Sequence, residues 1–199
     1  MIDEHLLVEQ ARNGERDAFR QLVELYQVKI YRLAYDLTGN GMDAEDLSQD
    51  VFVKAFRSLQ NFRGDAKFGT WLYRITVNTC FDHRSKKSLS MSTPLSHTEQ
   101  EDDAAPREPA GTGILPDQAA EASLIQKNIE LALEQLTPRE KTVFMLRHYH
   151  DLPLKEIAET LEISLGSVKT LLFRAVRRLQ EELSIYREDY DFVRKGNVS

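Results

Sequence analysis

The sequence predicts an all-α protein built from two small helical domains that are joined by a flexible acidic linker. Apolar residues recur at steps of three and four over most of residues 5–87 and 118–183, which is the spacing of amphipathic helices. Residues 88–117 between them hold prolines, glycines and acids without a periodic apolar face. Near the end of the second stretch, a short helix, a tight turn and a longer helix are predicted, and this order is typical of a helix-turn-helix.

Composition limits the classes of protein that fit. The chain has 199 residues, a net charge of −6 and a hydrophobic share of 41%, values that suit a soluble globular protein. Residues 87–126 carry 7 acidic and 2 basic side chains, so the acidity is concentrated in the middle. The single cysteine, Cys80, excludes an internal disulfide and fits a reducing cytoplasm. No apolar run approaches the ~20 residues of a membrane span, so membrane insertion is not expected.

The first domain is predicted to span residues 1–87 and to begin with two helices between residues 5 and 37. Asn13-Gly14 separates them, and Asp17 is expected to cap the second. Residues 38–41, Thr-Gly-Asn-Gly, should end it, because both glycines tolerate the left-handed conformation of a helix stop.

A third helix is expected from about Asp43 to Gln60. Its predicted buried stripe consists of Leu47, Val51, Phe52, Ala55, Phe56 and Leu59. A second face carries, again at helical spacing, Asp46, Gln49, Asp50 and Val53. This polar strip is either ordinary solvated helix surface or a docking strip for a polar or basic partner helix.

The loop at residues 61–67 and the helix expected from about Phe68 to His83 interleave aromatic and basic residues. Aromatic rings can stack on unpaired bases while cations follow the phosphates, so the stretch could hold a single strand. Alternatively, the rings are core and the charges are solvated. Inward-facing residues are predicted to be Phe68, Leu72, Ile75 and Thr79, and the opposite side is predicted to carry Thr70, Arg74, Val77, Asn78 and Phe81.

The second domain is predicted to span residues 118–184 and to begin with a helix at about 118–135. Thr137, Pro138 and Glu140 form a predicted capping box for the next helix. The helix-turn-helix follows, with its turn at Glu162 to Ser164 and with Ser164 capping the second helix. That helix exposes Lys169, Thr170, Phe173, Arg174, Arg177 and Arg178. Such a basic face suits the major groove of DNA, although a helical hairpin that is basic for other reasons stays open.

Three further features bound the function. The acidic linker is either a plain spacer or a strand that occupies a basic channel in a partner. The histidines lack cysteine or carboxylate partners at metal-ligand spacing, and no phosphate-binding loop or nucleophile motif occurs. We therefore expect neither an enzyme nor a bound metal or cofactor, and the tail at 185–199 supports no inference.

Three segments together resemble the bacterial RNA polymerase sigma factors of the extracytoplasmic-function (group IV) type. DAEDLSQDVFVKAF resembles the core-polymerase-binding segment of that family, FRGDAKFGTWLYRITVN its promoter-melting and minus-10 segment, and LPLKEIAETLEISLGSVKTLLFRAVRRL its minus-35 helix-turn-helix. The resemblance covers about residues 5–87 and 118–183.

The resemblance implies a dissociable subunit of RNA polymerase that is bound at the β′ clamp helices and the β flap. It implies polymerase-binding residues Asp46, Gln49, Asp50 and Val53. For minus-10 DNA, captured as a melted strand with a flipped base, it implies Phe62, Arg63, Gly64, Asp65, Ala66, Lys67, Trp71, Arg74 and Asn78. For the minus-35 duplex it implies Ser167, Lys169, Thr170, Phe173, Arg174, Arg177 and Arg178.

The family resemblance also implies a cytoplasmic protein without a third intervening domain, a class that is usually held inactive by an anti-sigma factor. The alternative is a free-standing helix-turn-helix regulator that binds duplex DNA as a symmetric dimer. The aromatic and basic stretch discriminates between them, because a regulator that binds only duplex DNA needs no platform for unpaired bases.

Overall fold

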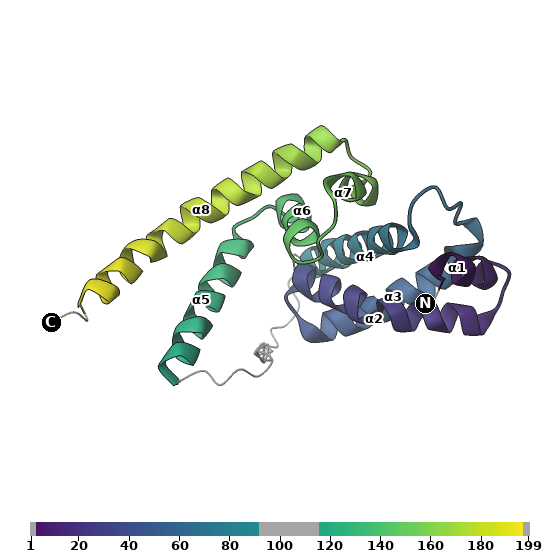
Figure 1. Cartoon of the computed structure of the whole chain (residues 1–199), viewed down its shortest axis with the longest axis horizontal. Coiled ribbons are helices and arrows are strands. Elements are labelled where there is room, and N and C mark those ends of the chain that lie inside the picture. The colour runs from purple at the N-terminus through teal and green to yellow at the C-terminus, as the bar shows by residue number, and fades with distance from the viewer. Residues whose placement is uncertain (1–2, 92–115, 197–199) are drawn as a thin grey trace. The chain divides into compact units, whose positions relative to one another are not determined.

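Figure 1 shows the chain as a computed structural model, which describes residues 3–91 and 116–196. Every regular element in these two ranges is helical, as predicted. The elements are α1 (Glu4–Arg12), α2 (Arg16–Thr38), α3 (Gly41–Ser58), the short 3-10 helix η1 (Leu59–Asn61), α4 (Phe68–Met91), α5 (Pro116–Glu134), α6 (Pro138–His148), α7 (Leu154–Leu161) and α8 (Leu165–Gly196). The acidic residues 92–115 of the predicted linker lie outside the described residues, so its flexibility stays a prediction.

The described residues form two compact units. Unit 1 consists of the residues up to Met91 together with Met145–Ile163, and unit 2 consists of Pro116–Phe144 and Ser164–Gly196. Helix α6 therefore contributes to both. The ends of the predicted linker are helical, since α4 continues to Met91 and α5 begins at Pro116.

Unit 1 has its core between α2, α3 and α4, which lie side by side in Figure 1, and α1 packs on α2. The apolar stripe of each helix turns inward, and the largest fully buried side chains of this core are Leu22, Ile30, Leu33, Val51, Leu59, Leu72 and Val77. Each buried side chain of this size contributes about 1.5–3 kcal/mol relative to an exposed one. The fold of unit 1 therefore rests on the periodicity that is visible in the sequence.

The helix ends of unit 1 follow local chemistry. The Asp3 carboxylate caps α1 by accepting from the backbone N–H of His5 at 3.1 Å. Gly39 ends α2 in the left-handed conformation (φ 73°), as predicted. Two predictions were wrong: α2 begins at Arg16, so Asp17 lies inside its first turn and does not cap it, and Gly41 is the first residue of α3 rather than part of the stop.

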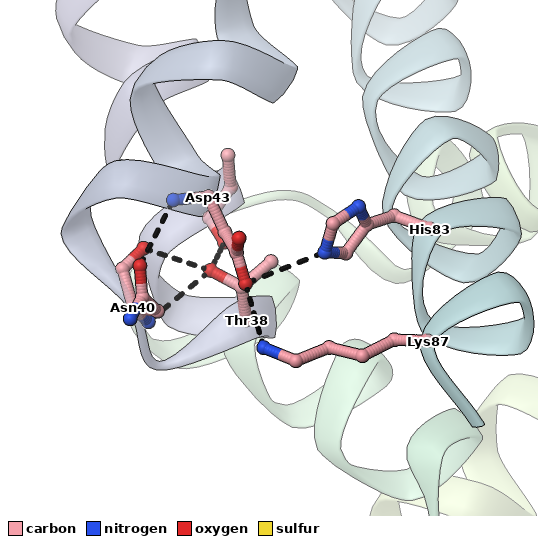
Figure 2. Close-up of polar contacts among 6 residues, drawn as sticks. Thr38, Asn40, Asp43, His83 and Lys87 are labelled. Carbon is pink, nitrogen blue, oxygen red and sulfur yellow. Dashed lines mark hydrogen bonds and ion pairs between the residues drawn. The ribbon is translucent and has the colours of Figure 1, made fainter. Parts of the chain in front are cut away.

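Polar contacts fix the start of α3 against α4 (Figure 2). The Asn40 side chain caps α3 by accepting from the backbone N–H of Asp43 at 2.9 Å. The Asp43 carboxylate in turn lies 3.3 Å from His83 Nε2 and accepts a hydrogen bond from Lys87 Nζ at 3.2 Å. Because both partners lie in the second half of α4, the carboxylate connects the two helices near the end of the bundle.

The predicted faces of α3 and α4 need corrections. Phe56 is not buried but 49% exposed, and its ring lies edge-on to Phe19 with the centroids 5.0 Å apart. On α4, Thr70 and Val77 were predicted on the outer side but are buried. Helix α4 has buried residues on more than one face because it contacts α2, α3 and also α7 of the same unit.

In unit 2, α5 packs against α8. The buried side chains of unit 2 include Ala132, Leu133, Leu136, Val143, Val168, Ala175 and Leu179. The predicted capping box is confirmed: Glu140 accepts from the backbone N–H of Thr137 at 3.0 Å, and the Thr137 hydroxyl accepts from the N–H of Glu140 at 3.4 Å. This exchange satisfies two backbone donors that the start of α6 would otherwise leave unpaired.

Candidate polymerase-binding and nucleic-acid-binding surfaces

The polar strip of α3 lies on the solvent side of the helix. Asp46, Gln49 and Asp50 are exposed, and Val53 is 47% exposed. The exposed ring of Phe56 continues the strip one turn further, a residue that sequence reasoning had placed in the core. Two carboxylates beside two apolar side chains form a surface that can dock a basic, partly apolar helix.

The loop between η1 and α4 is anchored at both ends by aromatic rings. Phe62, the first residue of the loop, is only 7% exposed, and its ring centroid lies 6.0 Å from that of Phe68 and 5.0 Å from that of Trp71. Phe68 begins α4 and lies 5.5 Å from Trp71. Because Phe62 is buried, it is available to position the loop rather than to stack on a base, whereas Trp71 is half-buried.

Between these anchors the loop presents polar groups to solvent. Arg63, Gly64, Asp65 and Lys67 are exposed, and Ala66 is half-buried. Gly64 has φ 79°, a left-handed conformation that glycine adopts at little cost. The loop therefore combines a backbone turn at Gly64 with exposed charges of both signs.

Two cations of this region are paired within unit 1. Lys67 Nζ donates to Glu156 of α7 at 2.5 Å, and Arg74 donates to Glu162 after the end of α7. The hydrogen bond to Glu156 raises the pKa of Lys67 above its usual value. Asn78, one turn beyond Arg74, is exposed. A nucleic-acid phosphate that bound either cation would have to replace its carboxylate partner, and of these partners Glu162 is 67% exposed and Glu156 is 22% exposed.

The inner side of α4 packs against neighbouring helices of unit 1 and is not available to a ligand. Lys54 of α3 donates to the Thr79 hydroxyl at 2.9 Å. Cys80 is buried among Ala34, Ala44 and Leu47, and burial raises the pKa of its thiol to about 12. The cysteine is thus a packing residue, and the raised pKa keeps its thiol protonated at neutral pH.

The basic face of α8 is exposed where the sequence placed it. Lys169, Thr170, Phe173 and Arg174 all face solvent, with Phe173 67% exposed. Ser164 caps the helix as predicted, because its hydroxyl accepts from the backbone N–H of Ser167 at 3.0 Å. One exposed ring and two exposed cations on the same stretch of α8 can meet base edges and phosphates in a major groove.

The two remaining arginines of this face are engaged within unit 2. Arg177 donates to Glu181 at 2.9 Å. Arg178 donates to the Gln135 carbonyl and to the Glu140 carboxylate, both at 3.1 Å. Arg178 therefore connects α8 to the capping box of α6, a role that sequence reasoning missed because those two residues lie about 40 positions earlier in the chain.

Neither a metal site nor a membrane-spanning helix is found among residues 3–91 and 116–196. No group of three or more His, Cys, Asp and Glu side chains in these ranges could hold a metal ion. Within the same ranges, no helix combines the length and the apolar composition needed to cross a bilayer.

Comparisons with known proteins show the family of the chain. Residues 22–89 match Sigma-70 region 2, and residues 126–179 match Sigma-70, region 4. The chain is 32% identical over 176 residues to the ECF RNA polymerase sigma factor SigW of Bacillus subtilis, a match that covers 88% of this chain and 94% of SigW. The chain belongs to the ECF family of RNA polymerase sigma factors. A similar match to this sigma factor, 32% over 181 residues, comes from the RNA polymerase sigma-H factor of Pseudomonas aeruginosa and covers 89% of this chain and 92% of that relative.

Solved structures agree with the family. CnrH, in a complex with the cytosolic domain of CnrY, matches this sigma factor with a TM-score of 0.67 and 25% identity over 92% of this chain and 99% of CnrH. The sigma factor RpoE of Bartonella quintana, solved with the anti-sigma factor NepR, has a TM-score of 0.62 at 23% identity over 84% of this chain and 97% of RpoE, which supports the fold alone. Sigma factors bind RNA polymerase and promoter DNA, so the surfaces above belong to a transcription initiation factor.

Proposed function

We propose that the sigma factor divides promoter recognition between its two predicted domains. Residues 1–87 would bind core polymerase, melt the promoter and capture minus-10 bases, and residues 118–184 would read the minus-35 duplex. The observation that carries this proposal is the loop at 62–67. Phe62 at its start packs against Phe68 and Trp71, and its polar residues are exposed. On the adjoining helix α4, Asn78 exposes an amide that could hydrogen-bond to a base edge.

Core polymerase would dock on the α3 strip of Asp46, Gln49, Asp50 and Val53, with Phe56 as a further contact. Mixed acidic and apolar character supports a partner helix of basic character, the β′ clamp helices in this family. Exposed carboxylates at the edge of such an interface mainly raise the association rate and orient the partner. The β flap is the second polymerase contact that the family resemblance implies.

Minus-10 recognition would use the loop and the outer face of α4. Trp71 offers a half-exposed ring for stacking, Arg63 and Lys67 offer cations for phosphates, and Asn78 offers an amide for a base edge. A phosphate at Lys67 would replace the Glu156 carboxylate as the partner of an ammonium group that is 76% exposed. On α8, Lys169, Phe173 and Arg174 would make the minus-35 contacts; Ser167 and Thr170 lie on the same face.

We also assign the sigma factor to the cytoplasm, where polymerase and the genome are found, and we assign it no chemistry of its own. An anti-sigma factor is the expected regulator, supported by the partner that is named for Bartonella quintana RpoE. The acidic linker and the tail at 185–199 receive no specific role.

Transcription with core polymerase on fragmented genomic DNA, with and without the chain, tests the proposal. Specific new transcripts should appear only when both proteins are present, and Asp50→Arg should reduce them strongly at limiting concentrations of the chain. Asp17→Arg is the matched control because it reverses an 83% exposed carboxylate on α2. If the chain fails to associate with polymerase and instead binds a palindromic duplex as a twofold dimer, a free-standing regulator replaces this proposal.

A further inference from the structure

Tyr26 packs against Phe68 and Gly69, the first two residues of α4 after the loop at 62–67. Its ring is buried in the middle of α2, and its hydroxyl approaches the backbone of Gly69, the second residue of α4. A Cβ atom at Gly69 would lie 2.9 Å from the Tyr26 hydroxyl oxygen and 3.0 Å from its Cε1 atom. Such a contact is too short for any side chain, so Tyr26 and Gly69 determine how closely α4 approaches α2.

The same ring connects to both ends of the loop. Tyr26 packs edge-on against Phe68, with the centroids 5.5 Å apart and an angle of 70° between the planes. Phe68 in turn contacts Phe62 and Trp71. Edge-to-face pairs of aromatic rings are favourable beyond the apolar area that they bury. The Tyr26 ring therefore contacts Phe68 directly and reaches Phe62, the first residue of the loop, through Phe68.

The position of Tyr26 is fixed by α1. The phenol donates a hydrogen bond to the Glu4 carboxylate at 3.0 Å, and Glu4 lies in the first turn of α1. Burial, and then the charge and hydrogen bond of Glu4, raise the pKa of Tyr26 above its usual value, so the phenol remains a donor at neutral pH. Helix α1 lies before the residues that match Sigma-70 region 2.

We propose that Tyr26, oriented by Glu4, is a positioning residue for the capture of the melted minus-10 strand. The inference rests on the proposed function of the loop and adds α1 to the elements that act in it. A flipped base is held only if the loop is already close to its bound geometry, because each misplaced group costs binding free energy. Glu4 and Tyr26 would hold the loop in this geometry through Phe68 without contacting DNA. They lie outside the α3 strip that we propose as the polymerase-docking surface.

The test compares Tyr26→Phe, Glu4→Ala and Glu4→Gln in holoenzyme. Tyr26→Phe retains the ring and removes the hydroxyl; Glu4→Ala removes the acceptor, whereas Glu4→Gln retains an amide oxygen that can accept. Two quantities are measured: the affinity of the chain for core polymerase, and the fraction of promoter with permanganate-reactive thymines. A single hydrogen bond is worth a factor of about 5. Tyr26→Phe and Glu4→Ala should each lower opening about fivefold, Glu4→Gln should restore most of it, and core affinity should not change.

The double variant of Tyr26→Phe with Glu4→Ala should open promoters no worse than either single variant, because both remove one shared contact. Wild-type opening in both single variants would overturn the inference and leave the proposed function intact. A loss of core affinity in proportion to the loss of opening would overturn it as well, because the two residues would then only stabilise unit 1. If the wild-type holoenzyme opens no promoter, the proposed function fails first.

Discussion

Arg174 and Arg178 lie one turn apart on α8, yet their replacement by alanine should have different consequences. Arg178 Nη1 donates to the Glu140 carboxylate and to the Gln135 carbonyl, both at 3.1 Å, whereas Arg174 is exposed. We therefore expect Arg178→Ala to destabilise unit 2, and Arg174→Ala to weaken minus-35 binding by about 1–3 kcal/mol with a much smaller loss of stability.

The magnitude for Arg178 follows from its surroundings. The Glu140 side chain is 5% exposed and that of Arg178 is 42% exposed. A hydrogen bond to a charged group contributes about 1.5–3 kcal/mol, and partial exposure of the guanidinium places this pair at the lower end because water screens it. Glu140 retains the backbone N–H of Thr137. We expect a loss of about 1.5–2 kcal/mol, which corresponds to roughly 10 °C in the melting temperature of a unit of this size.

The pH dependence gives an independent check. Burial alone would raise the pKa of Glu140, but the hydrogen bonds with Thr137 and the charges of Arg178 and Arg174 together hold it below its usual 4.5. A carboxyl group with a lowered pKa stabilises the folded state above its unfolded pKa, and this stabilisation is lost as the pH falls through the folded value. The difference in unfolding free energy between wild type and Glu140→Gln should be constant above about pH 5 and shrink below 4.5.

Circular dichroism melts of the variants between pH 7 and pH 3 measure the stability, and binding of holoenzyme to a minus-35 duplex below all melting temperatures measures the affinity. The reasoning is refuted if Arg178→Ala melts like wild type and loses as much duplex affinity as Arg174→Ala. Arg178 would then be a DNA contact, and its bonds to Gln135 and Glu140 would be incidental.

Three other expectations concern unit 1. Asp50→Arg should lower the affinity for core polymerase at least tenfold in pull-down titrations while Asp17→Arg does not, and equal effects would remove the α3 strip from the account. Gly69→Ala should destabilise the fold by about 1–3 kcal/mol in urea unfolding, because the added methyl group overlaps the Tyr26 hydroxyl; an unchanged midpoint would show that the ring moves freely. Cys80 should resist alkylation at pH 8 until the chain is denatured, because its buried thiol is protonated, and rapid labelling of the native protein would contradict this.

The sequence predicted best what is determined locally. The capping box of Thr137 and Glu140, the helix stop at Gly39 and the cap at Ser164 depend on residues within four positions of one another, and all three are confirmed. The apolar period likewise predicted the helical fold. Asp17 failed as a cap because helix starts vary by one or two residues with the surrounding packing.

What the sequence could not predict depends on residues that are distant in the chain. Phe56 follows the apolar period of α3, but its ring meets Phe19 at the edge of the core and remains half-exposed. Val77 is buried because α4 has neighbours on several sides. Glu140, the partner of Arg178, and Glu4, the partner of Tyr26, lie 38 and 22 positions away in the chain. No local residue spacing could therefore predict these contacts. The assignment of individual DNA and polymerase contacts remains a prediction.

Permanganate footprinting of one promoter is the most direct test of the claim that this sigma factor and core polymerase together melt promoter DNA. The account predicts unpaired thymines around the minus-10 element only when both proteins are present, and fewer of them with Trp71→Ala although core affinity is retained. Full thymine reactivity with Trp71→Ala, or binding of the chain alone to a paired palindrome with no reactive thymine under any condition, would contradict it.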